Sequence, residues 1–138
     1  MMMAFAVSSM GLAASAQKIK ANMVPAKVIA SFAKQYPGTE VKWEKEAGKY
    51  EAGFKKDGNV MSALYEANGT MMESEKDIKV NALPATVLAY LKANYKGKTI
   101  KEAAIITKAD GTITYEAEVN GKDVIFDSNG KFIKEMKG

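Results

Sequence analysis

The sequence predicts an α+β domain made of two tandem α-β-β-β-β repeats, which form an antiparallel sheet with two helices packed on one face. Three observations predict it: an internal repeat, an amphipathic helical pattern at the start of each copy, and alternating strands joined by Asn-Gly and Asp-Gly turns. Whether the two copies form one continuous sheet or two facing sheets is left open by the sequence.

The internal repeat runs through most of the chain. Residues 24–30 (VPAKVIA) recur as residues 83–89 (LPATVLA), and residues 50–52 (YEA) recur as residues 115–117. Two copies are too few for a solenoid, so we expect them side by side in one compact domain.

Each copy is expected to begin with a helix. Pro25 and Pro84 suit the first helical position, where a missing N–H costs nothing. Apolar residues then recur at helical spacing, with lysines on the other faces. These stripes consist of Ile29, Phe32, Ala33 and Tyr36 in the first helix and of Leu88, Leu91 and Tyr95 in the second. Pro37-Gly38 and Lys96-Gly97 are expected to end the helices.

The strands are predicted from apolar and polar residues that alternate with period two. Val41 and Trp43 alternate with charged residues, and the same pattern recurs at residues 50–54 and 113–119. Asn-Gly and Asp-Gly dipeptides, which supply the positive φ of tight hairpin turns, separate the runs. They are Asp57-Gly58, Asn68-Gly69, Asp110-Gly111, Asn120-Gly121 and Asn129-Gly130.

Residues 1–16 (MMMAFAVSSMGLAASA) differ from the rest because they carry no charge. They end in a small-x-small cleavage pattern and are too short to span a bilayer as a helix. We expect a signal peptide cleaved after Ala16, although the positive n-region of such a peptide is missing; a buried N-terminal helix is the alternative. The mature domain is then 17–138, with repeat one at about 22–76 and repeat two at about 81–137. It should be periplasmic or secreted, with no membrane span.

The composition excludes several common classes of active site. All 20 basic residues are lysines, against 16 acidic ones, and His, Cys and Arg are absent. A Ser-His-Asp or Cys-His arrangement, a Cys or His zinc site, a disulfide and a bidentate arginine clamp therefore cannot be built. We expect no enzyme activity, no cofactor and no metal. Lysines and acidic residues are interspersed, so the net charge of +4 does not indicate nucleic-acid binding.

The combination of these motifs resembles a known family. A helix led by Val-Pro or Leu-Pro, then Tyr36-Pro37-Gly38, a strand with Trp43, Tyr50-Glu51-Ala52 and Asn-Gly hairpins resembles the PepSY-like family of β-lactamase-inhibitor-like exported bacterial proteins. The resemblance covers roughly residues 22–137. It implies a two-repeat sheet domain of the cell envelope without an established biochemical activity, and it transfers no inhibitory motif.

Two groups of acidic residues could carry chemistry. Glu44 with Glu46, and Glu116 with Glu118, each share a strand face, as the two carboxylates of a glycosidase must share a cleft. Solvated strand faces with lysine counter-charges explain these pairs better. Those lysines are Lys42, Lys45, Lys122 and Lys131. The Asp57 and Asp110 turns hold one carboxylate each, which is too few for an EF-hand calcium loop.

A binding patch is the remaining candidate. Trp43 has no aromatic counterpart in repeat two, where it aligns with Glu102 or, with a moved gap, with Ile106. Met61 and Tyr65 share one face of their strand, whereas Val60 and Leu64 share the other. Because helices cover only one face, we predict that Trp43, Met61 and Tyr65 contribute to a patch on the exposed sheet face. The alternative is a sheet covered by its own loops or by a second copy of the chain.

The predicted function is an exported, non-enzymatic binding module that engages a protein or peptide through the exposed sheet face. Inhibition or regulation of an envelope hydrolase is one form of that function. The alternative is a small-ligand carrier or a self-assembling structural protein of the envelope, and a homo-oligomer is left open. An apolar pocket between helices and sheet favours the carrier, and an open sheet favours the protein partner.

Overall fold

A computed structural model describes residues 16–137. The predicted signal peptide therefore lies, but for Ala16, outside the described residues. The described chain forms nine strands and two α-helices. The elements are β1 (Gln17–Ile19), α1 (Ala26–Gln35), β2 (Lys42–Glu46), β3 (Lys49–Lys56), β4 (Asn59–Tyr65), β5 (Met71–Ile78), α2 (Ala85–Asn94), β6 (Ile100–Lys108), β7 (Ile113–Val119), β8 (Lys122–Phe126) and β9 (Phe132–Lys137), with short 3-10 helices at Ala21–Met23 and Val80–Ala82.

The strands form one continuous antiparallel sheet. Each strand pairs with the next along the chain, in the order β1 to β9. The α+β prediction is thus confirmed, and the open question of one sheet or two is resolved as one. The strand β1, which pairs with β2, and the two 3-10 helices were not predicted.

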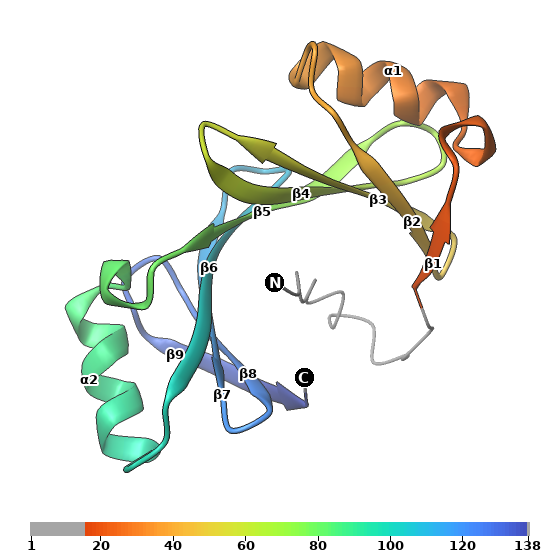
Figure 1. The fold of residues 1–138 in the computed structure, drawn as a ribbon. Helices are drawn as coiled ribbons and strands as arrows, with labels where there is room; N and C mark the ends of the chain where they lie inside the picture. The colour runs from red at the N-terminus through yellow and green to blue at the C-terminus, as the bar shows by residue number, and fades with distance from the viewer. Residues whose placement is uncertain (1–15, 138) are drawn as a thin grey trace.

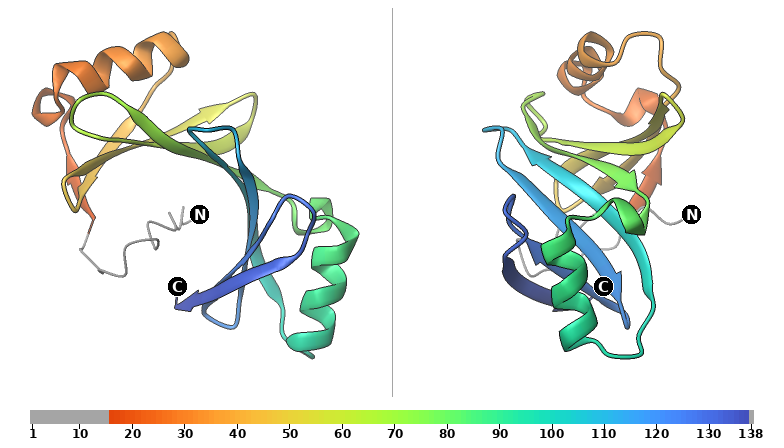
Figure 2. Two further views of the ribbon diagram at one scale, coloured as in Figure 1. Left: turned by 180° about the vertical axis from the view of Figure 1, so that it is seen from behind. Right: turned by 90° about the vertical axis from the view of Figure 1, so that its left-hand side faces the viewer.

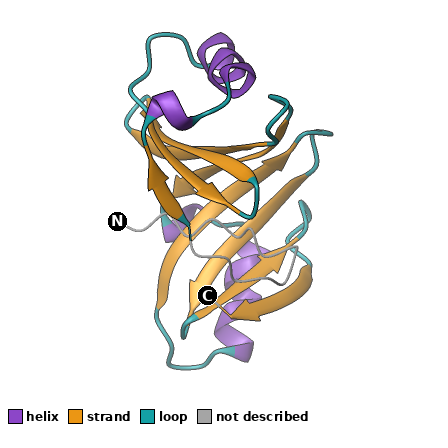
Figure 3. Cartoon of the chain, turned by 90° about the vertical axis from the view of Figure 1, so that its right-hand side faces the viewer, coloured by secondary structure: helices purple, strands orange, loops and turns teal. Residues whose placement is uncertain are grey.

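The sheet is bent, and both helices lie on its outer, convex side. Figure 1 shows α1 over β1 to β4 and α2 over β6 to β9, with β5 and β6 crossing between the two halves. The views from behind and from the side show the same separation of the helices (Figure 2). No helix covers the inner, concave side of the strands in the described part of the chain (Figure 3). This concave side is called the helix-free face below.

The helices begin and end close to the predicted positions. Pro25 and Pro84 are N-cap residues, so each helix starts one residue later than expected. The N–H of Tyr36 closes α1 on the carbonyl of Phe32, and Gly38 follows with a φ of 69°. That left-handed conformation favours glycine and stops the helix.

Each helix covers its own hydrophobic core. The residue that each helix buries most deeply, Val28 in α1 and Val87 in α2, lies one position before the predicted stripe. The first core consists of Val24, Val28, Phe32, Trp43, Tyr50, Ala52, Phe54, Ala63 and Tyr65. The second consists of Leu83, Val87, Leu91, Ala103, Ala117, Val119, Val124 and Phe126.

The strand register shows which positions of the two repeats correspond. Trp43 lies opposite Ala52, and Ala103 lies opposite Ala117. Since Ala52 and Ala117 follow the two Tyr-Glu motifs, the counterpart of Trp43 is Ala103. Neither alignment considered from the sequence, with Glu102 or with Ile106, matches this pairing. A register shift between Leu64 and Tyr65 recurs between Ile125 and Phe126, as expected of repeats.

Candidate functional site

The structure places the predicted patch on the helix-covered side of the sheet. Trp43 is 4% exposed and Tyr65 is 0% exposed, and Met61 packs partly buried against the same core under α1. The three residues are brought together, but the expectation that they lie on an open face is wrong. The reason is the register: Trp43 and Tyr65 share a face with Ala52 and Tyr50, and α1 covers that face.

An apolar groove nevertheless runs beside α1. It has a volume of about 390 Å³, and Trp43 lies in its wall. The indole Nε1 of Trp43 is buried and has no hydrogen-bond partner. The other wall residues are Ala21, Ile29, Phe32, Ala33, Tyr36, Gly38, Thr39, Glu40 and Val41.

The helix-free face is rich in acidic residues. Strand pairing places Glu51 opposite Glu44, Glu75 opposite Ile106, and Glu116 opposite Ala104, all on the face that the helices leave open. The acidic residues of this face are Glu44, Glu46, Glu51, Glu73, Glu75, Asp77, Glu102, Glu116, Glu118 and Asp123.

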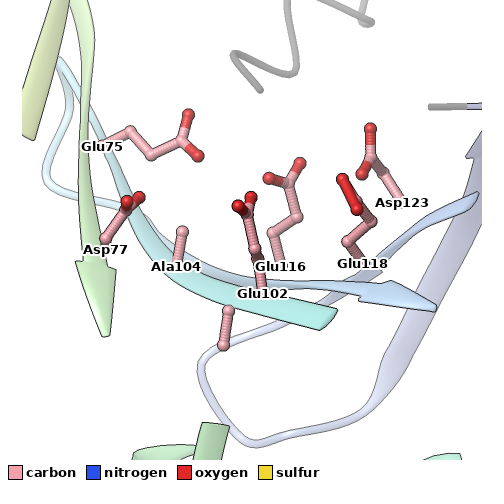
Figure 4. Close-up of a pocket in the computed structure, with 8 residues that line it drawn as sticks. Glu75, Asp77, Glu102, Ala104, Glu116, Glu118 and Asp123 are labelled. Atoms are coloured by element: carbon pink, nitrogen blue, oxygen red, sulfur yellow. The ribbon is translucent and has the colours of Figure 1, made fainter. Parts of the chain in front are cut away.

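Six of these carboxyls line one small pocket, called the acidic pocket below. They are Glu75 and Asp77 of β5, Glu102 of β6, Glu116 and Glu118 of β7, and Asp123 of β8. Figure 4 shows their side chains rising from neighbouring strands on one side of the sheet. The small side chains of Ala103 and Ala104 complete the lining. The cavity is about 10 Å³, which is room for about one water-sized group.

The acidic pocket contains buried carboxyl oxygens without partners. Glu75, Glu116 and Asp123 are 4%, 5% and 5% exposed. Oε2 of Glu75, Oε2 of Glu116 and Oδ1 of Asp123 accept no hydrogen bond. A buried polar atom that lacks a partner costs about 1–3 kcal/mol, and a buried charge costs more.

Little positive charge lies near the carboxyls of this pocket to balance their negative charge. In the described part of the chain, its one ion pair joins Nζ of Lys101 to Oε2 of Glu118 at 3.8 Å, and the Lys101 side chain is 74% exposed. An exposed pair of that kind contributes little. The buried carboxyls therefore need protons or an added cation.

Burial raises the pKa of the carboxyls at the base of the pocket. Desolvation is the main cause for Glu75, with the neighbouring Glu116 charge adding to it. Desolvation also raises the pKa of Glu116, and the Asp123 charge adds to that. The pKa of Asp77 and of Asp123 is raised for the same reason. In the other half of the sheet, burial and the Glu44 charge raise the pKa of Glu51 to about 8.

The structure corrects the view of Glu116 and Glu118 as a solvated pair. Glu116 is buried, and of the predicted counter-charges Lys122 pairs instead with Glu135, at 3.2 Å. Reasoning from the sequence did not identify the neighbours of Glu116 and Glu118 in the acidic pocket, which are Glu75, Asp77, Glu102 and Asp123. The available signal was an acidic residue at alternate positions of two runs, Glu73, Glu75 and Asp77 in the first and Glu116 and Glu118 in the second. Glu102 and Asp123 are single acidic residues of two other strands.

Neither a metal site nor a membrane helix is found in residues 16–137. No three acidic side chains there are arranged to hold a metal ion. Neither α1 nor α2 has the length and apolar character needed to cross a bilayer.

Comparison with known families gives one match. The family described as "Putative beta-lactamase-inhibitor-like, PepSY-like" matches residues 11–72 and again residues 49–134. Two successive matches agree with the internal repeat. No curated protein matches the chain.

Several solved structures share the fold. A "DUF2874 family protein" from Bacteroides uniformis superposes with a TM-score of 0.75 at 20% identity, covering 83% of this chain and 89% of its own. A "putative periplasmic" protein from Bacteroides eggerthii gives 0.75 at 15% identity, with coverages of 83% and 88%. A "BLIP-like protein" from Bacteroides fragilis gives 0.65 at 24% identity, with coverages of 82% and 86%. At these identities the likeness establishes the fold.

Proposed function

The chain belongs to the PepSY-like, β-lactamase-inhibitor-like family, and on this premise we propose that it is an exported, non-enzymatic module that binds a protein or peptide on its helix-free face. The observation that carries the proposal is that face itself. It is a broad sheet surface without a covering helix in the described chain (Figure 1), and it holds buried carboxyls whose oxygens lack partners. A partner that lies across the strands supplies the missing contacts.

Three further facts support the proposal. The chain has no His, Cys or Arg, so catalysis that depends on an imidazole, a thiol or a guanidinium is excluded. The family description names inhibitor-like proteins, which act by binding. A structural neighbour is described as periplasmic, and residues 1–16 have the composition of an export signal. Inhibition or regulation of an envelope hydrolase is the form of binding that we propose to test first.

The test is capture of a partner by immobilised protein (residues 17–138) from the envelope extract of its own host. Glu118→Lys reverses a charge on the helix-free face, where the side chain is 18% exposed. Glu66→Lys makes the same change in the loop between β4 and β5, which packs against α1 through Ser31 and Gly69. We expect a stoichiometric protein that Glu66→Lys retains and Glu118→Lys loses. Equal retention by both variants would place binding elsewhere.

A second candidate function is a small-ligand carrier, which the groove beside α1 favours. The groove is apolar, and the unpartnered Nε1–H of Trp43 could donate one hydrogen bond to a ligand. Native mass spectrometry of the purified protein would show a co-purifying apolar molecule with a hydrogen-bond acceptor. Ala33→Phe, which narrows the groove, should remove that mass; a ligand unaffected by Ala33→Phe contradicts binding in the groove.

A further inference from the structure

We propose that the acidic pocket is a recognition site for the ammonium group of a lysine side chain presented by the partner. The inference rests on the proposed function and names the chemistry that the helix-free face would recognise.

The pocket matches an ammonium group in size, and its buried carboxyl oxygens are acceptors for N–H donors. Its cavity of about 10 Å³ has room for about one water-sized group. Three buried carboxyl oxygens, from Glu75, Glu116 and Asp123, accept no hydrogen bond. A lysine ammonium carries three N–H donors and no acceptor, and its long apolar stem can cross the sheet surface.

Other cations fit less well. A guanidinium is a planar fork that is larger than one water molecule, and it pairs best with carboxylates open to bidentate contact. A metal ion needs several oxygens already arranged around one point, and no group of three acidic side chains fit for a metal ion exists in the described residues. An ammonium group can bind through one or two carboxyls, because water can accept its remaining N–H groups. The observations therefore favour a lysine ammonium over an arginine or a metal ion.

The repeat provides an internal comparison for this site. Strand register matches Lys42 of β2 with Glu102 of β6, since Gly53 lies opposite the first and Glu118 opposite the second. It likewise matches Ser62 of β4 with Asp123 of β8. Repeat one thus has lysine, glycine and serine where repeat two has Glu102, Glu118 and Asp123. The shared fold does not require the acidic pocket.

Protonation explains why the fold can hold these buried carboxyls when no ammonium is bound. Raised pKa values keep Glu75 and Glu116 protonated at neutral pH, and a bound ammonium must displace protons from them. Binding should therefore release protons and strengthen as the pH rises from 6 to 9. The charged groups that face the Glu75–Glu116 pair are Glu51, Glu73, Asp77, Glu102, Glu118, Asp123, Lys101, Lys108 and Lys134.

The probe is a capped nine-residue Gly/Ser peptide with one central lysine, titrated into isotopically labelled protein (residues 17–138) and followed by backbone amide NMR shifts. The expected result is saturable shifts confined to β5 to β8, which grow stronger at higher pH. The same peptide with N-acetyl-lysine should give no shifts. A peptide with central arginine should bind at least about tenfold more weakly.

Two variants locate the site. Glu75→Gln with Asp123→Asn should weaken lysine-peptide binding by at least about tenfold, because neutral amides cannot pair with the ammonium. Both changes conserve shape, so the amide spectrum should otherwise stay folded. Glu44→Gln with Glu51→Gln, on the same face of repeat one, is the matched control and should leave binding unchanged.

Three outcomes overturn the inference. They are no saturable shifts with the lysine peptide, equal binding of the acetylated peptide, and tight binding of Ca²⁺ alone at the same residues. Failure here differs from failure of the proposed function. If a captured partner is lost with Glu118→Lys but retained by the Glu75→Gln and Asp123→Asn double variant, the helix-free face remains the binding surface and lysine recognition is rejected.

Discussion

The two halves of the sheet share a backbone but differ on both of their faces. The half under α1 has Trp43, Phe54 and Phe32 where the half under α2 has Ala103, Val119 and Leu91. The opposite face differs in charge. Positions occupied by Lys42, Gly53 and Ser62 in the first half are occupied by Glu102, Glu118 and Asp123 in the second.

This difference shows what the fold requires and what it leaves free. Both halves retain a proline before the helix, a tyrosine near the helix end and a glycine-containing turn under the helix, so these features belong to the architecture. At the three core positions compared above, the first half holds the larger side chains on both its helix and its strands. The carboxyls of the acidic pocket bury polar groups without adding apolar contact, which is a cost that the proposed binding role would explain.

The largest expected effect concerns the aromatic core of the first half. Trp43 packs edge-on against Phe32 at a centroid distance of 5.6 Å and lies near Tyr65 at 6.3 Å. Trp43→Ala should lower the free energy of unfolding by about 3–5 kcal/mol, because it removes a large buried side chain and leaves a cavity. Urea denaturation monitored by circular dichroism measures the change.

The matched control is Ala103→Gly at the corresponding site of the second half, where little side chain is present to lose. It should cost about 1 kcal/mol, chiefly through backbone entropy. A Trp43→Ala variant as stable as the parent would contradict the packing under α1. It would also restore the idea of a patch of Trp43, Met61 and Tyr65 that contributes to binding and not to stability.

The next effect is the dependence of stability on pH. Glu75 and Glu116 have folded pKa values above their unfolded value of 4.5. Between the unfolded and folded pKa values the folded state holds more protons, so the unfolding free energy is highest at low pH within this range and falls as the pH rises. We expect a loss of roughly 1–3 kcal/mol between pH 5 and pH 9.

Glu75→Gln with Glu116→Gln should remove most of that slope, because amides do not titrate. Glu51→Gln, on the first half, should remove less, since it eliminates one buried carboxyl whose pKa is raised to about 8. Urea titrations at several pH values measure both slopes. Equal effects of the two variants would show that the carboxyls of the acidic pocket are no more costly to the stability than Glu51.

The third prediction compares the glycines that lie under the two helices. Gly69 has a φ of 91°, and an added Cβ would lie 2.7 Å from the backbone oxygen of Lys27. Gly130 has a φ of 82°, and its added Cβ would overlap the Thr86 hydroxyl. Since a side chain can move and a helical carbonyl cannot, Gly69→Ala should be more destabilising than Gly130→Ala, by about 1 kcal/mol.

Two further variants isolate the clash from the backbone strain. Gly58→Ala has a similar φ of 79° with no atom nearby, so it reports strain alone, about 1–2 kcal/mol. Thr86→Ala should recover part of the stability lost in Gly130→Ala. Thermal denaturation ranks all four variants. A ranking with Gly58→Ala as the worst would show that close approach to the helices does not matter.

The sequence predicts the parts of this fold that depend on local periodicity. The helices after Pro25 and Pro84 and the turns at Asp57-Gly58 and Asn120-Gly121 are confirmed, the last two with positive φ at both residues. Local patterns could not show which face of the sheet the helices cover. Trp43 and Tyr65 lie on the helix-covered face and not on the predicted open face, although Met61 and Tyr65 share one face of β4 as predicted.

The acidic pocket was harder to predict because its residues come from four strands. Glu75 and Asp77 belong to the end of repeat one, whereas Glu102, Glu116 and Asp123 belong to repeat two. Their convergence depends on the pairing of β5 with β6, which joins the two repeats into one sheet. Because the sequence does not decide between one sheet and two, it could not predict that these carboxyls lie close together.

The smallest expected effect concerns two tyrosine hydrogen bonds, each of which joins the end of one helix to the sheet. In the first half, the hydroxyl of Tyr65 on β4 donates to Oε1 of Gln35 at the end of α1, at 2.6 Å. In the second half, Tyr95 after α2 donates to Oε1 of Glu135 on β9, at 2.9 Å and in an exposed setting. Tyr65→Phe should cost about 1 kcal/mol, because it leaves Gln35 without its partly buried partner.

Tyr95→Phe should cost less, about 0.5 kcal/mol, because water can replace the lost bond and Glu135 keeps its ion pair with Lys122 at 3.2 Å. Added salt should weaken the contribution of the Tyr95 bond, whose acceptor is charged, more than that of the Tyr65 bond. Urea denaturation at low and high salt measures both. A larger loss for Tyr95→Phe would mean that the second helix, whose core holds smaller side chains, depends more on its polar attachment than the first.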